Sequence, residues 1–357
     1  MSSELRWWVK VGSSVFWMLL VFAGSGCDSV KSVVDQRNAQ SKSPAPVTQT
    51  PETTPPSQPA VPVAVSQTPQ QIIQVFLAKS GQEIRDEDLQ QLAALKEGLE
   101  AITTLDLARS AVSDAGLPAL SAFPKLTSLN LSDTRVSNAG MASVAQVKSL
   151  RTLTLANLRG VGDDGIQSLT PLLDLESLTI ATCPVTDAIL PMLAEFQGLQ
   201  VLSLSGNTDI YGKDFKKLTA KGAFRNLREL HVDGSKFGFY GMEQLNKLTK
   251  LEVLRASGCE VVGKALNLAG CDELKVLDLS RNTMVDDNLK GISRLKKLEE
   301  LRLERMSLTD ECLNSIKTMK QLKILDLEGT RVTPDAIKLL KEKFLKETEV
   351  WALGQKF

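Results

Sequence analysis

The chain has 357 residues, with 42 basic and 42 acidic residues and a formal net charge of zero. This balance gives no whole-chain electrostatic case for a nucleic-acid partner. Hydrophobic residues make up 43% and aromatic residues only 5% of the chain, which suits a continuous core of aliphatic side chains.

The first 27 residues have the layout of a secretory signal. Arg6 and Lys10 precede an apolar run over residues 11–23, which is short for a membrane span. The following Gly-Ser-Gly-Cys resembles the box of bacterial lipoproteins, which implies that Cys27 carries a lipid, although Gly24 stands where that box usually has leucine. Ordinary signal cleavage and an uncleaved anchor remain alternatives. We expect an exported protein, anchored on the periplasmic or extracellular side of a membrane that the sequence does not identify.

Residues 28–68 have no apolar period and contain seven prolines among many Ser, Thr and Gln residues. Such a composition cannot bury a core, so it predicts a disordered linker. The linker is interpreted as a tether that holds the next domain away from a membrane. The alternative is a spacer with no further role.

Residues 69–101 are predicted to form an N-terminal helical cap. Its apolar side chains are those of Ile72, Ile73, Val75, Phe76 and Leu77, followed by Leu89, Leu92 and Leu95 at helical spacing. A cap is expected because the open end of a repeat array would otherwise expose its core.

Residues 102–345 repeat one phrase, Leu-x-x-Leu-x-Leu, ten times. The spacings between copies are 23 to 25 residues, except for one of 28, and a fixed period in this range predicts a solenoid. The first apolar positions are Ile102, Leu126, Leu150, Leu175, Leu199, Leu227, Leu251, Leu274, Leu298 and Leu322. After each predicted strand a small polar residue is placed to cap a helix, as at Ser113, Ser137, Thr186, Thr309 and Thr333.

These units resemble leucine-rich repeats of the cysteine-containing, ribonuclease-inhibitor-like type. The resemblance covers about two thirds of the chain and implies an α/β fold, a right-handed solenoid with a parallel concave sheet and convex helices. Members of this class are mostly non-catalytic interaction scaffolds. Residues 346–357 are expected to close the C-terminal end, with Trp351 in the capping core.

Four of the five cysteines lie inside the repeats and do not form a disulfide or metal-site pattern. Cys183 and Cys259 occupy the ninth position of their repeats, where other repeats have Ser, Thr or Asn. We expect these side chains to satisfy backbone groups in the turn. Cys271 and Cys312 are expected to pack as small hydrophobic residues, with a Cys259–Cys271 disulfide as the alternative. No metal and no cofactor are expected.

The third, fifth and seventh positions of each phrase should face outward on the concave sheet, because strand side chains alternate. They are small and neutral in the first five repeats, with Asp106 as the main exception, and charged from the sixth onward. The partner-binding candidates on this face are Glu229, His231, Asp233, Arg255, Asp278, Arg302, Glu304 and Asp326. The alternative is a solvated surface in which Arg255 pairs with Asp278 and Arg302 pairs with Asp326.

A second candidate surface lies in repeats 5 and 6. Repeat 5 has 28 residues, and residues 213–250 contain nine Lys or Arg residues against four Asp or Glu residues. Tyr211, Phe239 and Tyr240 stand where other repeats have small or polar residues. Aromatic and basic residues are favoured in interfaces, which predicts a protein or an anionic envelope polymer as partner. The alternative is local packing over an irregular turn.

The sequence contains no motif of a known active site. We therefore expect a monomeric, non-enzymatic, macromolecule-binding scaffold on the bacterial cell envelope. A structural spacer or self-assembling envelope element is the alternative. A hydrolase that uses carboxylates such as Glu229 and Asp233 near the single histidine, His231, is the remote one.

Overall fold

The computed structural model describes residues 68–357, apart from residue 96 and residues 262–267. The expected signal peptide, Cys27 and the expected linker lie outside the described residues and stay predictions.

One 12-stranded sheet runs through the repeats in strict chain order. Strands β1 to β11 pair in parallel and β12 pairs antiparallel with β11. The strands are β1 (Thr104–Asp106), β2 (Ser128–Asn130), β3 (Thr152–Ala156), β4 (Ser177–Ala181), β5 (Val201–Ser203), β6 (Glu229–His231), β7 (Val253–Arg255), β8 (Val276–Asp278), β9 (Glu300–Arg302), β10 (Ile324–Asp326), β11 (Glu349–Ala352) and β12 (Gln355–Lys356). The predicted leucine-rich-repeat solenoid is confirmed.

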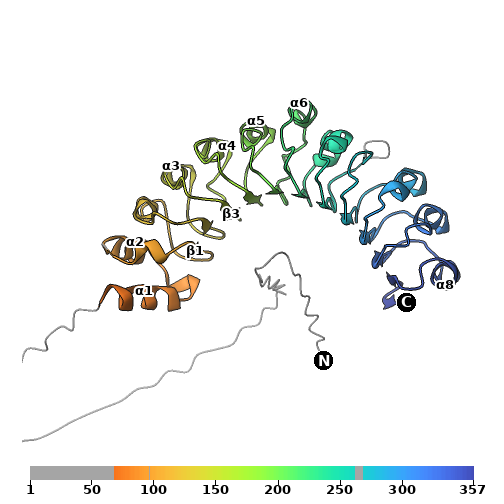
Figure 1. Cartoon of the computed structure of the whole chain (residues 1–357), viewed down its shortest axis with the longest axis horizontal. Helices are drawn as coiled ribbons and strands as arrows, with labels where there is room; N and C mark the ends of the chain where they lie inside the picture. The colour runs from red at the N-terminus through yellow and green to blue at the C-terminus, as the bar shows by residue number, and fades with distance from the viewer. Residues whose placement is uncertain (1–67, 96, 262–267) are drawn as a thin grey trace, which may run out of the picture. The chain divides into compact units, whose positions relative to one another are not determined.

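The segments that return from one strand to the next form short helices on the outer side of the solenoid, and the strands line its inner side (Figure 1). Many of these helices are 3₁₀ helices (η), as is common in short connectors. They are η3 (Leu117–Ala122), α3 (Asn138–Val144), α4 (Asp163–Gln167), η4 (Asp187–Ile189), α5 (Leu190–Leu193), α6 (Phe215–Ala220), η5 (Phe237–Phe239), η6 (Gly241–Lys247), η7 (Asp286–Leu289), η8 (Ile292–Arg294), η9 (Asp310–Cys312), α7 (Leu313–Ile316) and α8 (Pro334–Lys343).

The apolar positions of the phrase form one continuous core. In the second repeat, Leu126, Leu129 and Leu131 are fully buried, and the equivalent leucines of the neighbouring repeats pack against them. Each strand residue between them faces the inner surface. The core therefore sets the register, because a slip of one residue would turn the leucines outward.

The N-terminal end is covered by α1 (Pro69–Ala78), η1 (Gly81–Glu83), α2 (Asp86–Ala93) and η2 (Leu99–Ala101). Phe76, Leu89 and Leu92 are buried, as expected for a cap. Val75 and Leu77 are exposed, so their expected role in the cap core is wrong. α1 packs against α2 through the side of the helix that carries Phe76, and Val75 and Leu77 lie off that side.

The C-terminal end is closed by β11 and the antiparallel strand β12. Val350 is buried against the last repeat, and the next residue, Trp351, faces the opposite way. Trp351 lies beside Asp326 of β10 on the concave surface, so the expectation that it belongs to the capping core is wrong. Side-chain alternation along β11 explains the difference.

The predicted helix caps are largely confirmed. The side chains of Ser137, Thr186, Thr309 and Thr333 each accept a hydrogen bond from a backbone N–H in the first turn of the following helix. The helix cap expected at Ser113 is wrong, because no helix begins directly after this residue. Ser113 accepts from the Ala115 N–H, but η3 starts only at Leu117.

The ninth position of the repeats satisfies backbone groups, as predicted. The buried Asn207 amide donates to the carbonyls of Ile180 and Leu204 and accepts from the Cys183 N–H. Three repeats later, Asn282 makes the equivalent bonds to the carbonyls of Ala256 and Leu279 and accepts from the Val261 N–H. Cys183, Cys259, Cys271 and Cys312 are free and buried, so the alternative Cys259–Cys271 disulfide is wrong. Burial raises the pKa of the Cys259, Cys271 and Cys312 thiols to about 12, which keeps them unreactive.

Candidate functional site

The concave candidates lie on adjacent strands in a common register. His231 is paired with Arg255, Arg255 with Asp278, Asp278 with Arg302, and Arg302 with Asp326. The fifth phrase position thus forms one row across β6 to β10, and Trp351 of β11 ends it. Adjacent strands are about 4.8 Å apart, so these side chains form one continuous surface.

The same row is uncharged in the preceding strands, apart from Asp106 at its start. It holds Asn130, Thr154, Thr179 and Ser203 on β2 to β5. Because the backbone register does not change at β6, the difference between the two parts lies in side-chain chemistry alone.

His231 is half-buried and its Nε2 lies 3.4 Å from the Glu229 carboxylate. Asp233 is occupied elsewhere, because its carboxylate accepts from the Ser257 N–H and the Ser205 hydroxyl. The described residues contain no group of three or more His, Cys, Asp or Glu side chains placed to hold a metal ion. One histidine beside one carboxylate forms a single polar contact and does not make a catalytic cluster.

The alternative interpretation, in which these arginines and aspartates form cross-strand ion pairs, is wrong in that pairing. The Nε atom of Arg302 lies 2.6 Å from Glu300 on its own strand, and among the described residues it forms no ion pair with Asp326. Arg255 forms no ion pair with any described residue, although Asp278 lies beside it. Its guanidinium is therefore available to a partner.

Asp278, Glu304 and Asp326 lie close together on the concave surface. The Asp278 and Asp326 carboxylates each accept a backbone N–H two residues on, from Ser280 and Glu328. Burial, together with the negative charges of Glu304 and Asp278, raises the pKa of Asp326, although Arg302 opposes the shift. Glu304 is neutralised by Arg281 and Arg305 at the rim.

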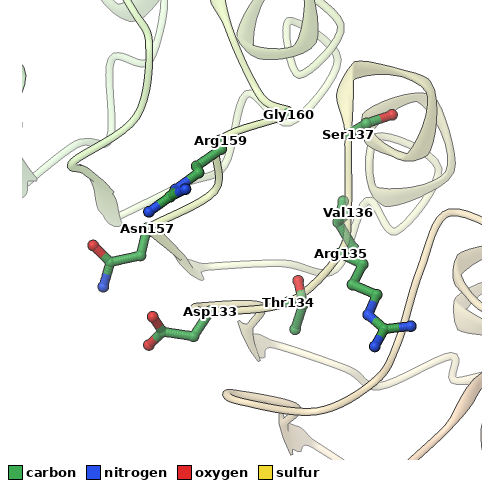
Figure 2. Close-up of a pocket in the computed structure, with 8 residues that line it drawn as sticks. All are labelled: Asp133, Thr134, Arg135, Val136, Ser137, Asn157, Arg159 and Gly160. Carbon is green, nitrogen blue, oxygen red and sulfur yellow. The ribbon is translucent and has the colours of Figure 1, made fainter. Parts of the chain in front are cut away.

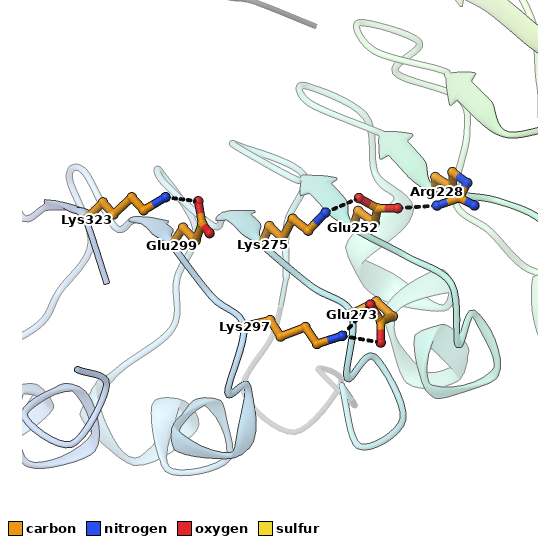
Figure 3. A network of polar contacts seen from close by, with 7 residues as sticks. All are labelled: Arg228, Glu252, Glu273, Lys275, Lys297, Glu299 and Lys323. Carbon is orange, nitrogen blue, oxygen red and sulfur yellow. Dashed lines mark hydrogen bonds and ion pairs between the residues drawn. The ribbon is translucent and has the colours of Figure 1, made fainter. Parts of the chain in front are cut away.

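A row of ion pairs runs along the edge where the strands begin (Figure 3). Glu252 accepts from Arg228 of the preceding repeat and from Lys275 of the next at 2.6 Å. Lys323 pairs with Glu299 at 2.7 Å in the same row. The pair of Lys297 with Glu273, at 2.6 Å, lies apart from the row and nearer the helices. These contacts join repeats 6 to 8 and, separately, repeats 9 and 10.

The sequence interpretation missed a set of aspartates that join consecutive repeats on the helical side. Asp163 accepts from the N–H and the hydroxyl of Thr186, the cap of the next repeat, at 2.8 and 2.7 Å. Asp114 likewise accepts hydrogen bonds from the N–H and the hydroxyl of Ser137. The full set is Asp86, Asp114, Asp163, Asp187, Asp286 and Asp310. The acidic residue that recurs beside the caps is the signal in the sequence that could have revealed these links.

The second candidate surface, at repeats 5 and 6, centres on Tyr211. The ammonium groups of Lys213 and Lys236 lie 5.3 and 5.2 Å from its ring centroid, and Lys236 also donates to its hydroxyl at 3.2 Å. Tyr240 is 49% exposed. The Phe239 backbone belongs to η5, and its side chain is outside the described part. The expected combination of aromatic and basic side chains is present, but on the outer edge, away from the concave row.

A shallow cavity of about 360 Å³ separates the turns that follow β2 and β3 (Figure 2). Asp133, Thr134 and Arg135 line one side, and Asn157 and Arg159 line the other. Figure 2 shows Arg159 directed toward Asn157, whereas Arg135 points away from it. The two cations do not converge on a common point, so the cavity does not form a charged pocket.

Within the described residues, no helix combines the length and the apolar character needed to cross a membrane.

Comparisons with known proteins support the repeat assignment. A family model described as "Leucine Rich repeat" matches residues 124–145. A protein named as a putative adenylate cyclase regulatory protein from Trypanosoma equiperdum is 40% identical over 78 residues, which are 22% of this chain and 12% of that protein. The chain thus spans about an eighth of this relative.

Two solved structures show the same fold. An internalin (inlF) from Listeria monocytogenes has a TM-score of 0.51 and 18% identity, over 80% of this chain and 88% of its own. The Arabidopsis receptor kinase HAESA, solved with the peptide hormone IDA and the co-receptor SERK1, has a TM-score of 0.50 and 21% identity, over 74% of this chain and 46% of its own. The chain is therefore a leucine-rich-repeat protein in fold.

Proposed function

We propose that the chain is a non-catalytic, protein-binding scaffold that uses the concave sheet of its C-terminal repeats. The observation that supports this most is the continuous charged surface of β6 to β11, with Arg255 unpaired beside Asp278. It is held by a rigid leucine core and carries no cluster of groups suited to catalysis. Proteins of this fold, such as HAESA with its peptide hormone, have protein or peptide partners.

The finer part of the proposal is display on the bacterial cell envelope as a monomer. The signal-like residues 1–27, the candidate lipid site Cys27 and the proline-rich residues 28–68 support export and tethering. The basic edge around Tyr211 supports a second contact, with an anionic envelope polymer.

The test is capture of a partner from envelope extract by the full chain and two variants. One variant carries Glu229→Ala, Arg255→Ala and Arg302→Ala, and the other carries Tyr211→Ala and Tyr240→Ala. We expect the partner to be lost with the first variant only. Loss with the second alone would move the site to the outer edge. An empty result for all three, with self-association in sedimentation, would favour the spacer.

A further inference from the structure

Three carboxylates on the concave face of β8 to β11, those of Asp278, Asp326 and Glu328, form no ion pair with a described residue, and Asp278 and Asp326 are the two that share the fifth-position row. Glu300 pairs with Arg302, Glu349 pairs with Lys356, and Glu304 pairs with the rim arginines. Asp278 and Asp326 form no ion pair with any described residue, and their hydrogen-bond donors are backbone N–H groups.

Asp278 is only 9% exposed. Burying a carboxylate without a cation costs free energy, so both groups are placed to gain from a positive charge that arrives from outside the chain. The raised pKa of Asp326, which comes first from burial, is consistent with the same need.

The chain itself provides an example of the chemistry at this end of the surface. The Lys356 ammonium lies 2.5 Å from a Glu349 oxygen and 5.8 Å from the centroid of the Trp351 ring. Trp351 lies next to Asp326 across the β10–β11 pair. An aromatic face beside a carboxylate is a favourable setting for a lysine or arginine side chain.

The spacing of the two carboxylates restricts the form of the partner. Asp278 and Asp326 lie two strand steps apart, with Arg302 between them, which corresponds to about 9.6 Å. A polyproline II segment has three residues per turn and rises about 9.3 Å in that turn, so every third side chain points the same way. In a β-strand, side chains on one face repeat at about 6.8 Å, which does not match.

We propose that the concave face of β8 to β11 docks a polyproline II segment of a partner protein that carries a lysine or arginine at every third position. Two of these cations bind Asp278 and Asp326, and the segment runs across the strands toward Trp351. This inference rests on the proposed function and names the partner's chemistry. The net negative charge of the face supplies the complementarity.

The experiment measures fluorescence anisotropy of labelled peptides with the full chain. The probes are (Lys-Pro-Pro)₄, its acidic match (Glu-Pro-Pro)₄, and (Lys-Pro-Pro-Pro)₃, which changes the cation spacing. At low salt we expect (Lys-Pro-Pro)₄ to bind roughly tenfold more tightly than either of the other probes. Raising the salt concentration should weaken the binding of (Lys-Pro-Pro)₄ itself roughly tenfold.

Two variants with the same change in net charge locate the site. Asp278→Asn with Asp326→Asn keeps the shape and the backbone hydrogen bonds, and should weaken binding of (Lys-Pro-Pro)₄ roughly tenfold. Glu342→Gln with Glu347→Gln removes two exposed carboxylates outside the concave rows and should leave binding within about twofold.

Equal binding of the lysine and glutamate probes, or equal losses in both variants, would overturn the inference. Equal binding of the two lysine spacings would overturn the polyproline II register. If none of the peptides binds, but the variant with Glu229→Ala, Arg255→Ala and Arg302→Ala still fails to capture the partner from envelope extract, the proposed function stands. Only the cationic polyproline II partner is then wrong.

Discussion

The strands before β6 and those from β6 onward have the same type of residue on the face that packs into the core. They differ in the residues on the concave, solvent-facing side. Leu129 of β2 and Leu301 of β9 are equally buried. The residues that follow them on the concave surface are Asn130 and Arg302. Stability and recognition are thus carried by alternate positions of the same strands, so the outward positions can change without cost to the core.

The two parts also differ in how consecutive repeats are joined. On the helical side, aspartates such as Asp163 and Asp286 bond to the cap of the next repeat, and Asp187 accepts backbone N–H groups of the next repeat, the first that of Tyr211. Between them, repeats 5 and 6 use an aromatic cluster instead. Phe215 stacks on Phe224 at 5.3 Å and meets Phe237 edge-on at 4.9 Å. From Arg228 onward the ion pairs at the strand starts are added.

The largest effect is expected at the aromatic junction between the two parts. Phe237→Ala removes a fully buried ring and should lower the free energy of unfolding by about 3–5 kcal/mol, because the cavity cannot fully collapse. Chemical denaturation measures this loss. Tyr240→Ala, in the same segment but half exposed, should cost far less. Similar losses of stability for both variants would show that the Phe237 ring does not join the two parts of the solenoid.

Removing one aspartate link should have the next largest effect. Asp163→Ala leaves the N–H and hydroxyl of Thr186 without their acceptor and should cost about 1–3 kcal/mol in thermal or chemical unfolding. The control is Asp164→Ala, because both residues lie in the first turn of α4 and share its dipole. Only Asp163 reaches the next repeat, so equal costs would assign the effect to the helix end.

The ion-pair row of the C-terminal repeats is tested by Glu252→Gln. The hydrogen bond from Lys275, and that from Arg228, lower the pKa of Glu252. A carboxylate with a lowered folded pKa adds stability above its unfolded pKa near 4.5 and loses it as the pH falls through the folded value. The partners are half-exposed, so the loss at neutral pH should be about 0.5–1 kcal/mol.

High salt should reduce this loss, because screening weakens the same pairs in the unmodified chain. Glu243→Gln, at an exposed position of η6, is the matched control and should cost little stability at any salt concentration, because Glu243 forms no ion pair with a described residue. A loss that persists at pH 3 would mean that the Glu252 side chain acts through packing.

The inward positions were predictable from sequence because their spacing is fixed by one period and one residue type. Every strand from β1 to β10 falls where the phrase places it. The contacts between outward residues were not predictable in the same way. Arg302 can reach both Glu300 and Asp326, and the choice depends on rotamers that a pattern does not encode. Trp351 shows the same limit, since a single alternation decides whether it packs inside or faces outward.

The smallest effect is expected at Asp326, and it has the opposite sign. A carboxyl whose folded pKa is raised holds its proton more tightly when folded, so stability is greatest below the unfolded pKa and falls as the pH rises through the folded pKa. Asp326→Asn removes that cost and keeps an acceptor for the Glu328 N–H. It should therefore raise the stability at pH 7 by a few tenths of a kcal/mol to about 1 kcal/mol, with the gain disappearing near pH 3.

Thermal melts at both pH values measure the difference, and Asp106→Asn on the uncharged part of the sheet is the control. A gain at Asp326 combined with weaker partner binding would show that the C-terminal half gives up stability for recognition. A loss of stability at pH 7 would mean that Arg302 already compensates this charge in the free chain.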